Sequence, residues 1–273
     1  MLLKSKAIMY KFKIQKTIMV SLAFIFNTTV AVPTIYVFGD SHALFCFNTV
    51  DDSKDPSHYY IVNVHHLFPC LLNNYTFNPS MEVHKTQYEE FPISIYAVPG
   101  FTMHRLGRDG LGALNINNFL IKQNDIVVFV FGEVDARANI GKQVKEKGRE
   151  LVEVIDTLVR SYIHTIIQNK SNLKCGIKCI ILNIVPPTSQ CGLDNIPLYG
   201  TIQERIMITR SLNLKLNIEC EKNDIIMLNV YDFYASLDGS LNPSLSDTCA
   251  HINFLYNYPI KQALLRIVHD TMA

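Results

Sequence analysis

The chain has 273 residues, of which 48% are hydrophobic and 18% are charged, a composition that suffices for a full core and excludes disordered, collagen-like and coiled-coil chains. Five lysines precede the first acidic residue, Asp40, and beyond them 20 basic residues face 24 acidic ones. Because nucleic-acid binding needs a dense basic surface, we do not expect nucleic acid as a partner.

A basic and then apolar segment opens the chain. Lysines between Lys4 and Lys16 are followed by the apolar run from Thr17 to Val32, which is too short for a stable membrane span and fits the core of a signal peptide. Thr29 and Ala31 supply the small residues of a cleavage site. We therefore expect residues 1–32 to be a leader for secretion. The alternative is an uncleaved anchor or a hydrophobic leader on a cytoplasmic protein.

Short apolar runs that end at Gly, Pro or Asp recur along the rest of the chain and have the form of buried parallel strands. Apolar residues at helical spacing lie between the last of them, in residues 151–166 and 202–216. The alternation predicts an α/β protein, a doubly wound three-layer sandwich whose ligands bind at the carboxyl ends of the strands. The five predicted strands are residues 33–38, 93–98, 125–131, 177–184 and 225–230.

Residues 51–90 interrupt this alternation with Pro, Asn, Tyr and His in no steady period, apart from a possible strand at Tyr59–Val64. We expect this segment to be an excursion over the active edge of the sheet. No linker rich in Pro, Gly or Ser marks a second domain, so residues 33–273 are predicted to form one domain.

Ser41 follows the first predicted strand, between Asp40 and His42, where a helix can begin. At a helix N-terminus its backbone N–H can help to stabilise an oxyanion, and its hydroxyl can act as a nucleophile. The alternative is that Ser41 only caps the helix.

A base for this serine stands near the other end of the chain. Asp247 and His251 are four residues apart, so His251 can take the Ser41 proton while Asp247 orients the imidazole. Activity is then expected to fall below a pH near the ordinary histidine pKa of ~6.5, raised somewhat by Asp247.

Four segments together resemble the signature blocks of the SGNH/GDSL hydrolases. The segments are VFGDSHALF, VPGFTMHRLGRDGL, DIVVFVFGEVDAR and SDTCAHIN, and they stand in family order over nearly the whole chain after Pro33. The resemblance implies a flavodoxin-like α/β/α sandwich on a five-stranded parallel sheet. It also implies catalysis by Ser41, His251 and Asp247 without a metal or cofactor.

The same resemblance implies an oxyanion hole in which Gly100 lends a backbone N–H beside that of Ser41. The alternative for Gly100 is a simple turn after Pro99. In the third block, Val134 stands where the family has an asparagine, and valine cannot donate a hydrogen bond. Arg137 or Asn139, in the same loop, is the expected substitute. The block resembles a subgroup of GDSH proteins with Gly-Glu-x-Asp-x-Arg at this position.

Polar residues beside these blocks are expected to bind substrate. The family resemblance implies a glycan or other small polar ester as the substrate, and polar residues around the site would suit a hydroxylated ester better than a lipid. The predicted substrate-binding residues are His42, His104, Arg105, Glu133 and Asp135.

The leading hypothesis is a serine acyl-ester hydrolase, and two alternatives remain open. An acyltransferase would pass the acyl group to a sugar hydroxyl, and a noncatalytic carbohydrate-binding module would keep the fold without turnover.

The chain has seven cysteines and no Cys-x-x-Cys pair, so most are expected to be buried thiols. If the chain is exported, Cys175, Cys179 and Cys191 are close enough in sequence to pair locally.

Overall fold

The computed structural model describes residues 32–48, 59–63, 80–189 and 197–272. The chain divides at Pro33, and residues 33–273 form one compact unit. The predicted leader lies almost entirely outside the described residues. So do Cys191 and most of the segment between residues 49 and 79.

A seven-stranded sheet in the order β2-β3-β4-β1-β5-β6-β7 forms the middle layer. Its strands β1, β4, β5, β6 and β7 are parallel to their neighbours and coincide with the five predicted strands. Their chain order across the sheet is second, first, third, fourth, fifth, which is the flavodoxin-like order that we predicted. The bounds are β1 Ile35–Gly39, β4 Phe91–Ala97, β5 Ile126–Val130, β6 Lys178–Leu182 and β7 Ile226–Leu228.

Two further strands make the sheet mixed, so the predicted count of five is too low. β3 (Ser80–Tyr88) pairs antiparallel with β4, and β2 (Tyr59–Asn63) pairs antiparallel with β3. The strand expected at residues 59–64 is confirmed as β2. The prediction that residues 51–90 cross the active edge of the sheet is wrong for β3, because this strand is added to the sheet beside β4. Its sequence, SMEVHKTQY, has the low β-propensity and weak alternation of a polar strand, so it gave no signal.

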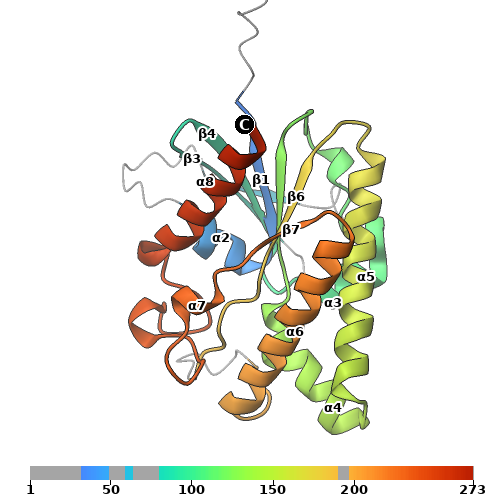
Figure 1. Ribbon diagram of the computed structural model, residues 1–273, viewed down its shortest axis with the longest axis vertical. Helices are drawn as coiled ribbons and strands as arrows, with labels where there is room; N and C mark the ends of the chain where they lie inside the picture. The colour runs from blue at the N-terminus through green and yellow to red at the C-terminus, as the bar shows by residue number, and fades with distance from the viewer. Residues whose placement is uncertain (1–31, 49–58, 64–79, 190–196, 273) are drawn as a thin grey trace, which may run out of the picture. The chain divides into compact units, whose positions relative to one another are not determined.

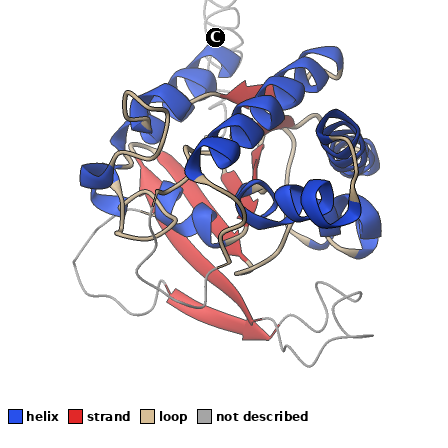
Figure 2. Cartoon of the chain, turned by 90° about the horizontal axis from the view of Figure 1, so that it is seen from below, coloured by secondary structure: helices blue, strands red, loops and turns tan. Residues whose placement is uncertain are grey.

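Helices cover both faces of the sheet, which gives the predicted three layers (Figures 1 and 2). One face packs against α3 (Met103–Asp109), α5 (Leu151–Asn172) and α6 (Ile202–Lys222) around Phe38 and Phe129. The other face packs against α2 (Ser41–Phe47), α7 (Tyr231–Tyr234) and α8 (Tyr258–Met272) around Val37 and Val128. Each fully buried side chain of this size contributes about 1.5–3 kcal/mol, so the alternation along β1 and β5 holds both layers in place.

Short elements complete the chain between these layers. A π-helical turn, η6 (Asp135–Asn139), leads directly into α4 (Ile140–Lys147). Four 3₁₀ turns lie in the remaining loops of the described residues: η4 (Gly110–Gly112), η5 (Ile116–Asn118), η7 (Pro243–Leu245) and η8 (Phe254–Tyr256).

The topology brings three loops together at one edge of the sheet. β1 lies between β4 and β5, so the chain reverses its direction across the sheet beside β1. Backbone bonds tie the strand ends: Val98 N–H donates to Gly39 O at 2.8 Å and Asp40 N–H donates to Val130 O at 3.1 Å. The segments after β1, β4 and β5, which carry three of the four sequence blocks, therefore meet at the edge where ligands bind in such sheets.

Candidate active site

Ser41 is the first residue of α2, and Asp40 is the cap of that helix. The Asp40 carboxylate accepts the backbone N–H of His42 at 2.8 Å. The alternative that Ser41 only caps the helix is therefore wrong, because the neighbouring residue Asp40 is the cap. The Ser41 hydroxyl is left to bond elsewhere, and its N–H, in the first helical turn, has no acceptor within the helix.

A tight loop before α8 holds His251. Asp247 Oδ1 accepts the backbone N–H of Cys249 at 2.8 Å and that of His251 at 3.1 Å. Asp247 N–H donates to the His251 carbonyl at 3.0 Å, which closes the loop from the other side. The carboxylate thus shapes the loop as well as facing the ring that the loop presents.

The structure brings the three predicted catalytic side chains into one hydrogen-bonded chain. Ser41 Oγ lies 2.8 Å from His251 Nε2, and His251 Nδ1 lies 2.8 Å from Asp247 Oδ2. With the proton on Nδ1, the neutral ring donates to Asp247 and its Nε2 accepts the Ser41 O–H. Phe45 stacks on the ring at 4.1 Å between centroids and 9° between planes, which fixes its orientation.

The predicted direction of the His251 pKa is wrong. Burial and the positive charge of His42 lower the pKa of His251 to about 4, and Asp247 opposes them without reversing the result. The prediction considered Asp247 alone. It could not include a second histidine whose ring centroid lies 4.5 Å away.

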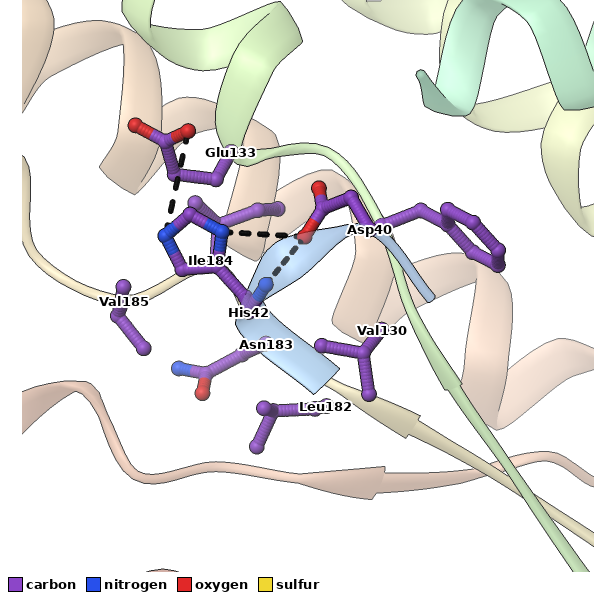
Figure 3. A pocket seen from close by; sticks show the side chains of 9 residues that line it. Asp40, His42, Val130, Glu133, Leu182, Asn183, Ile184 and Val185 are labelled. Atoms are coloured by element: carbon purple, nitrogen blue, oxygen red, sulfur yellow. Dashed lines mark hydrogen bonds and ion pairs between the residues drawn. The ribbon is translucent and has the colours of Figure 1, made fainter. Parts of the chain in front are cut away.

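His42 lies inside the protein. Its residue exposure is 4%, its Nδ1 is 3.0 Å from Asp40 Oδ1 and its Nε2 is 3.1 Å from the Ala250 carbonyl oxygen. Figure 3 shows His42 between Asp40 and Glu133, and His42 Nε2 is 3.9 Å from Glu133 Oε2. Burial alone would lower its pKa, but Asp40 and Glu133 outweigh burial and raise the pKa to about 9.

Glu133 is buried by the same cluster. Arg137 Nε donates to both of its carboxylate oxygens, at 2.8 and 3.0 Å, across the π-helical turn. Burial raises the pKa of Glu133, while His42 and Arg137 oppose the rise. The cavity that His42 and Glu133 line holds about 10 Å³, which is room for one water. The prediction that these two residues bind substrate is therefore wrong.

The other predicted oxyanion donors have partners of their own. Arg137, besides its bond to Glu133, donates from Nη1 to the Pro197 carbonyl at 3.1 Å. Asn139 Nδ2 donates to Asp135 Oδ1 at 3.2 Å. In these contacts both side chains stabilise the structure around them, and none of the contacts involves Ser41. Val134, at the missing asparagine position, is half-buried at the start of the π-helical turn.

Gly100 occupies a tight turn between Val98 and Phe101. The Phe101 N–H donates to Val98 O at 3.0 Å, and Gly100 has φ +73°, a conformation that favours glycine. The simple turn that we gave as the alternative is present. The turn is compatible with a role for the Gly100 N–H, because the site lies at the same sheet edge.

Asp135 supports α3. Its Oδ2 accepts the Met103 N–H at 2.7 Å, and burial raises its pKa to about 7 against the hydrogen bonds of Asn139 and Met103. The predicted substrate residues Asp135 and exposed His104 both border a pocket of about 400 Å³ between α3, α4 and α5. Arg105 places its guanidinium 5.4 Å from the Phe101 ring centre.

Sequence reasoning missed three features of the site: Asp40 as the helix cap, Phe45 against His251, and the Ala250 carbonyl that accepts from His42. The Asp at the capping position could have indicated the first. No local pattern indicates the other two, because they depend on contact between residues about 200 positions apart.

The structure also bears on the cysteines, on metal binding and on membrane-spanning helices. Cys175 and Cys179 are free thiols, so the local pairing predicted for them is wrong. Cys249 is disulfide-bonded. Within the described ranges, no three His, Cys, Asp or Glu side chains are grouped as metal ligands, and no helix has the length and apolar character needed to cross a membrane.

No family model and no curated protein matches the chain, but solved structures share its fold. A putative platelet activating factor from Streptococcus pneumonia is 15% identical over 94% of each chain, with a TM-score of 0.52. A putative acylhydrolase from Bacteroides fragilis is 14% identical over 90% of this chain and 94% of that one, also with a TM-score of 0.52. A GDSL-like lipase from Bacteroides thetaiotaomicron is 12% identical over 87% of this chain and 88% of that one, with a TM-score of 0.49. The chain shares its fold with the first two of these structures, and its sequence blocks resemble those of the SGNH/GDSL hydrolases.

Proposed function

We propose that the protein is a serine-dependent acyl-ester hydrolase that works through an acyl-enzyme. The observation that carries the proposal is the hydrogen-bonded chain from Ser41 Oγ through His251 to Asp247, with 2.8 Å at each step. Such a chain can convert a weak hydroxyl nucleophile into a reactive one. The neutral state of His251 supports the assignment, because only a neutral imidazole can accept the serine proton.

The proposed reaction has two halves. His251 Nε2 takes the Ser41 proton as Oγ bonds to the ester carbonyl carbon, and the resulting oxyanion intermediate collapses as the C–O bond to the alcohol breaks. His251 returns the proton to the leaving alcohol. In the second half, water attacks the acyl-enzyme with the same base, which releases the acid and restores the Ser41 hydroxyl.

The oxyanion would be held by backbone N–H groups. Ser41 supplies one from the first turn of α2, and we assign the second to Gly100, whose turn follows β4 beside β1. Val134 supplies no third donor. Since one donor is worth a factor of ~10²–10³ in rate, we expect turnover to be slower than in a site with three.

A carbohydrate ester is our proposed substrate class. The 400 Å³ pocket beside Asp135 is lined in part by His104, Arg108, Lys142 and Gln143, groups that can hydrogen-bond a hydroxylated ligand, although its lining does not include Ser41 or His251. Within the described chain, no specific contact favours the acyltransferase or the noncatalytic module over the hydrolase.

Fluorophosphonate labelling tests the serine assignment. Folded wild-type protein should be labelled at Ser41, and the matched variant Ser41→Ala should not be labelled. Hydrolysis of p-nitrophenyl acetate and of acetylated oligosaccharides then separates function from substrate class. A folded wild type that neither labels nor hydrolyses any ester would contradict the proposal, and release of acid only when a sugar acceptor is present would indicate a transferase.

We also propose that the protein is exported. The sequence of residues 1–32 supports this, and so does the disulfide at Cys249, since such bonds persist in oxidising compartments. Expression in a host with a secretory pathway, followed by N-terminal sequencing of the medium fraction, tests both export and cleavage. Retention of the full-length chain inside the cell would contradict the proposal.

A further inference from the structure

His42 follows the proposed nucleophile in sequence, yet the reaction described above does not use it. Its two ring nitrogens both face atoms that only accept hydrogen bonds: Asp40 Oδ1 at 3.0 Å and the Ala250 carbonyl oxygen at 3.1 Å. A neutral imidazole has one N–H and would leave one of these buried contacts unsatisfied. With Asp40 present as the carboxylate, both contacts are satisfied only when both nitrogens carry a proton, so His42 is then an imidazolium ion.

Charged groups on three segments surround this cation. Asp40 lies before α2, and Glu133, 3.9 Å away, lies after β5 with its own partner Arg137. Arg205 of α6 adds a positive charge that interacts with Glu133. The loop after β6 contributes only neutral groups to the cavity: Asn183, Ile184 and Val185 (Figure 3).

The remaining neighbour of His42 is His251, with its partner Asp247. The two rings lie 4.5 Å apart between centroids at an angle of 48°. The Ala250 carbonyl that accepts from His42 belongs to the residue just before His251. His42 is thus joined to the base in two ways, through the backbone of the loop and through the space between the rings.

We propose that His42 is a positioning residue for the ester hydrolase: it anchors the His251 loop through the Ala250 carbonyl, and its positive charge keeps the His251 ring neutral. This inference rests on the proposed function. Protonation of His251 would place a second positive charge beside the His42 cation, which is unfavourable, whereas Asp247 alone would favour protonation. The arrangement keeps the base able to accept the Ser41 proton in acid solution.

The pH profile of kcat/KM in His42→Gln tests the electrostatic part. Glutamine can donate to the Ala250 carbonyl but carries no charge. We expect the acid limb of the profile to move upward by roughly 1–3 pH units, while the activity above that limb stays within about tenfold of wild type. The control His164→Gln makes the same chemical change on the exposed side of α5 and should not move the limb.

A loss of activity that is equal at every pH, with no movement of the limb, would show a structural role alone and overturn the proposal. A smaller fraction of folded protein lowers activity throughout the profile without moving the acid limb. Exposure of His251 to water would also move the limb upward, so the shift counts only where circular dichroism shows an unchanged fold.

Nitrogen NMR of the histidine rings tests the same inference without any measurement of activity. In wild-type protein, His42 should keep both ring protons at pH 7 and lose one near pH 9, while His251 should stay neutral down to about pH 4. This measurement needs no variant, so it decides the question even if His42→Gln fails to fold. A neutral His42 at pH 7 would overturn the proposal, and the predicted titrations in a protein without esterase activity would refute only the proposed function.

Discussion

Two histidines at the same edge of the sheet each bond a carboxylate through Nδ1, yet they have opposite protonation states. His251 meets Asp247 at 2.8 Å and His42 meets Asp40 at 3.0 Å. They differ in what faces Nε2. The Ser41 hydroxyl can donate to His251, whereas the Ala250 carbonyl can only accept from His42.

The comparison shows that a carboxylate partner does not by itself decide the charge of an imidazole. Asp247 raises the pKa of His251, but burial and the cation beside it prevail and lower it to about 4. At His42, Asp40 and Glu133 together prevail over burial and raise the pKa to about 9. The second contact and the neighbouring charge separate a base from a fixed cation.

The largest expected effects on activity come from substitutions in the hydrogen-bonded chain of Ser41, His251 and Asp247. Ser41→Ala and His251→Ala should each lower kcat for p-nitrophenyl acetate by a factor of ~10⁶, and Asp247→Asn should lower it by a factor roughly 10² smaller. The members of the chain act as a unit, and Asp247 only orients and stabilises the ring. Circular dichroism and urea unfolding of each variant separate loss of chemistry from loss of fold. Near-wild-type turnover in folded Ser41→Ala would end the serine mechanism.

The second prediction concerns activity in acid. Since His251 must be neutral to act as a base and its pKa is about 4, kcat/KM should stay level from pH 7 to pH 5 and fall only near pH 4. A stopped assay with an acetylated sugar at each pH gives the profile. A midpoint near 6.5, the ordinary histidine value, would mean that burial and His42 together do not lower the pKa of the base.

The third prediction concerns the pH dependence of the free energy of unfolding, to which the two histidines should contribute slopes of opposite sign. The folded pKa of His42 is about 9, so its contribution is present below the unfolded value of 6.5 and is lost as the pH rises through 9. The folded pKa of His251 is about 4, so the unfolded chain binds more protons between pH 4 and 6.5, and the free energy of unfolding falls as the pH drops through that range.

The pair should therefore give a maximum near pH 6.5, with slopes that approach about 1.4 kcal/mol per pH unit on either side. Urea unfolding at pH 4.5, 6.5 and 8.5 measures the free energy of unfolding at the maximum and on both slopes. His42→Gln should lose the alkaline slope and also narrow the pH range of the acid one, because the pKa of His251 rises toward 6.5 without the neighbouring cation. An alkaline slope that persists in the variant would assign it to other groups.

The sequence predicted the parts of the molecule that depend on local pattern. The five parallel strands were recognisable as apolar runs, and the serine, histidine and aspartate as blocks in family order. The pattern did not reveal β3, a polar strand that depends on pairing with β4. Nor did it reveal that His42 and Glu133 face inward, because their burial results from contact between the loops that follow β1, β5 and α7.

The smallest expected effect lies in the loop that joins the two histidines. Thr248, between Asp247 and His251, is exposed and has φ +71°, a conformation that is strained for a β-branched residue. Thr248→Gly should relieve about 1–2 kcal/mol of that strain and lose about 0.5–1 kcal/mol to the greater freedom of the unfolded chain, so a net gain of about 0.5–1 kcal/mol in the free energy of unfolding is expected. The control Thr157→Gly, within α5, should instead lose about 0.5 kcal/mol, since no strain is relieved there. Urea unfolding of both variants measures the difference. If Thr248→Gly is as destabilised as the control, the side chain of Thr248 holds the loop, and the hydrogen bonds of Asp247 and His42 do not suffice to fix the position of His251.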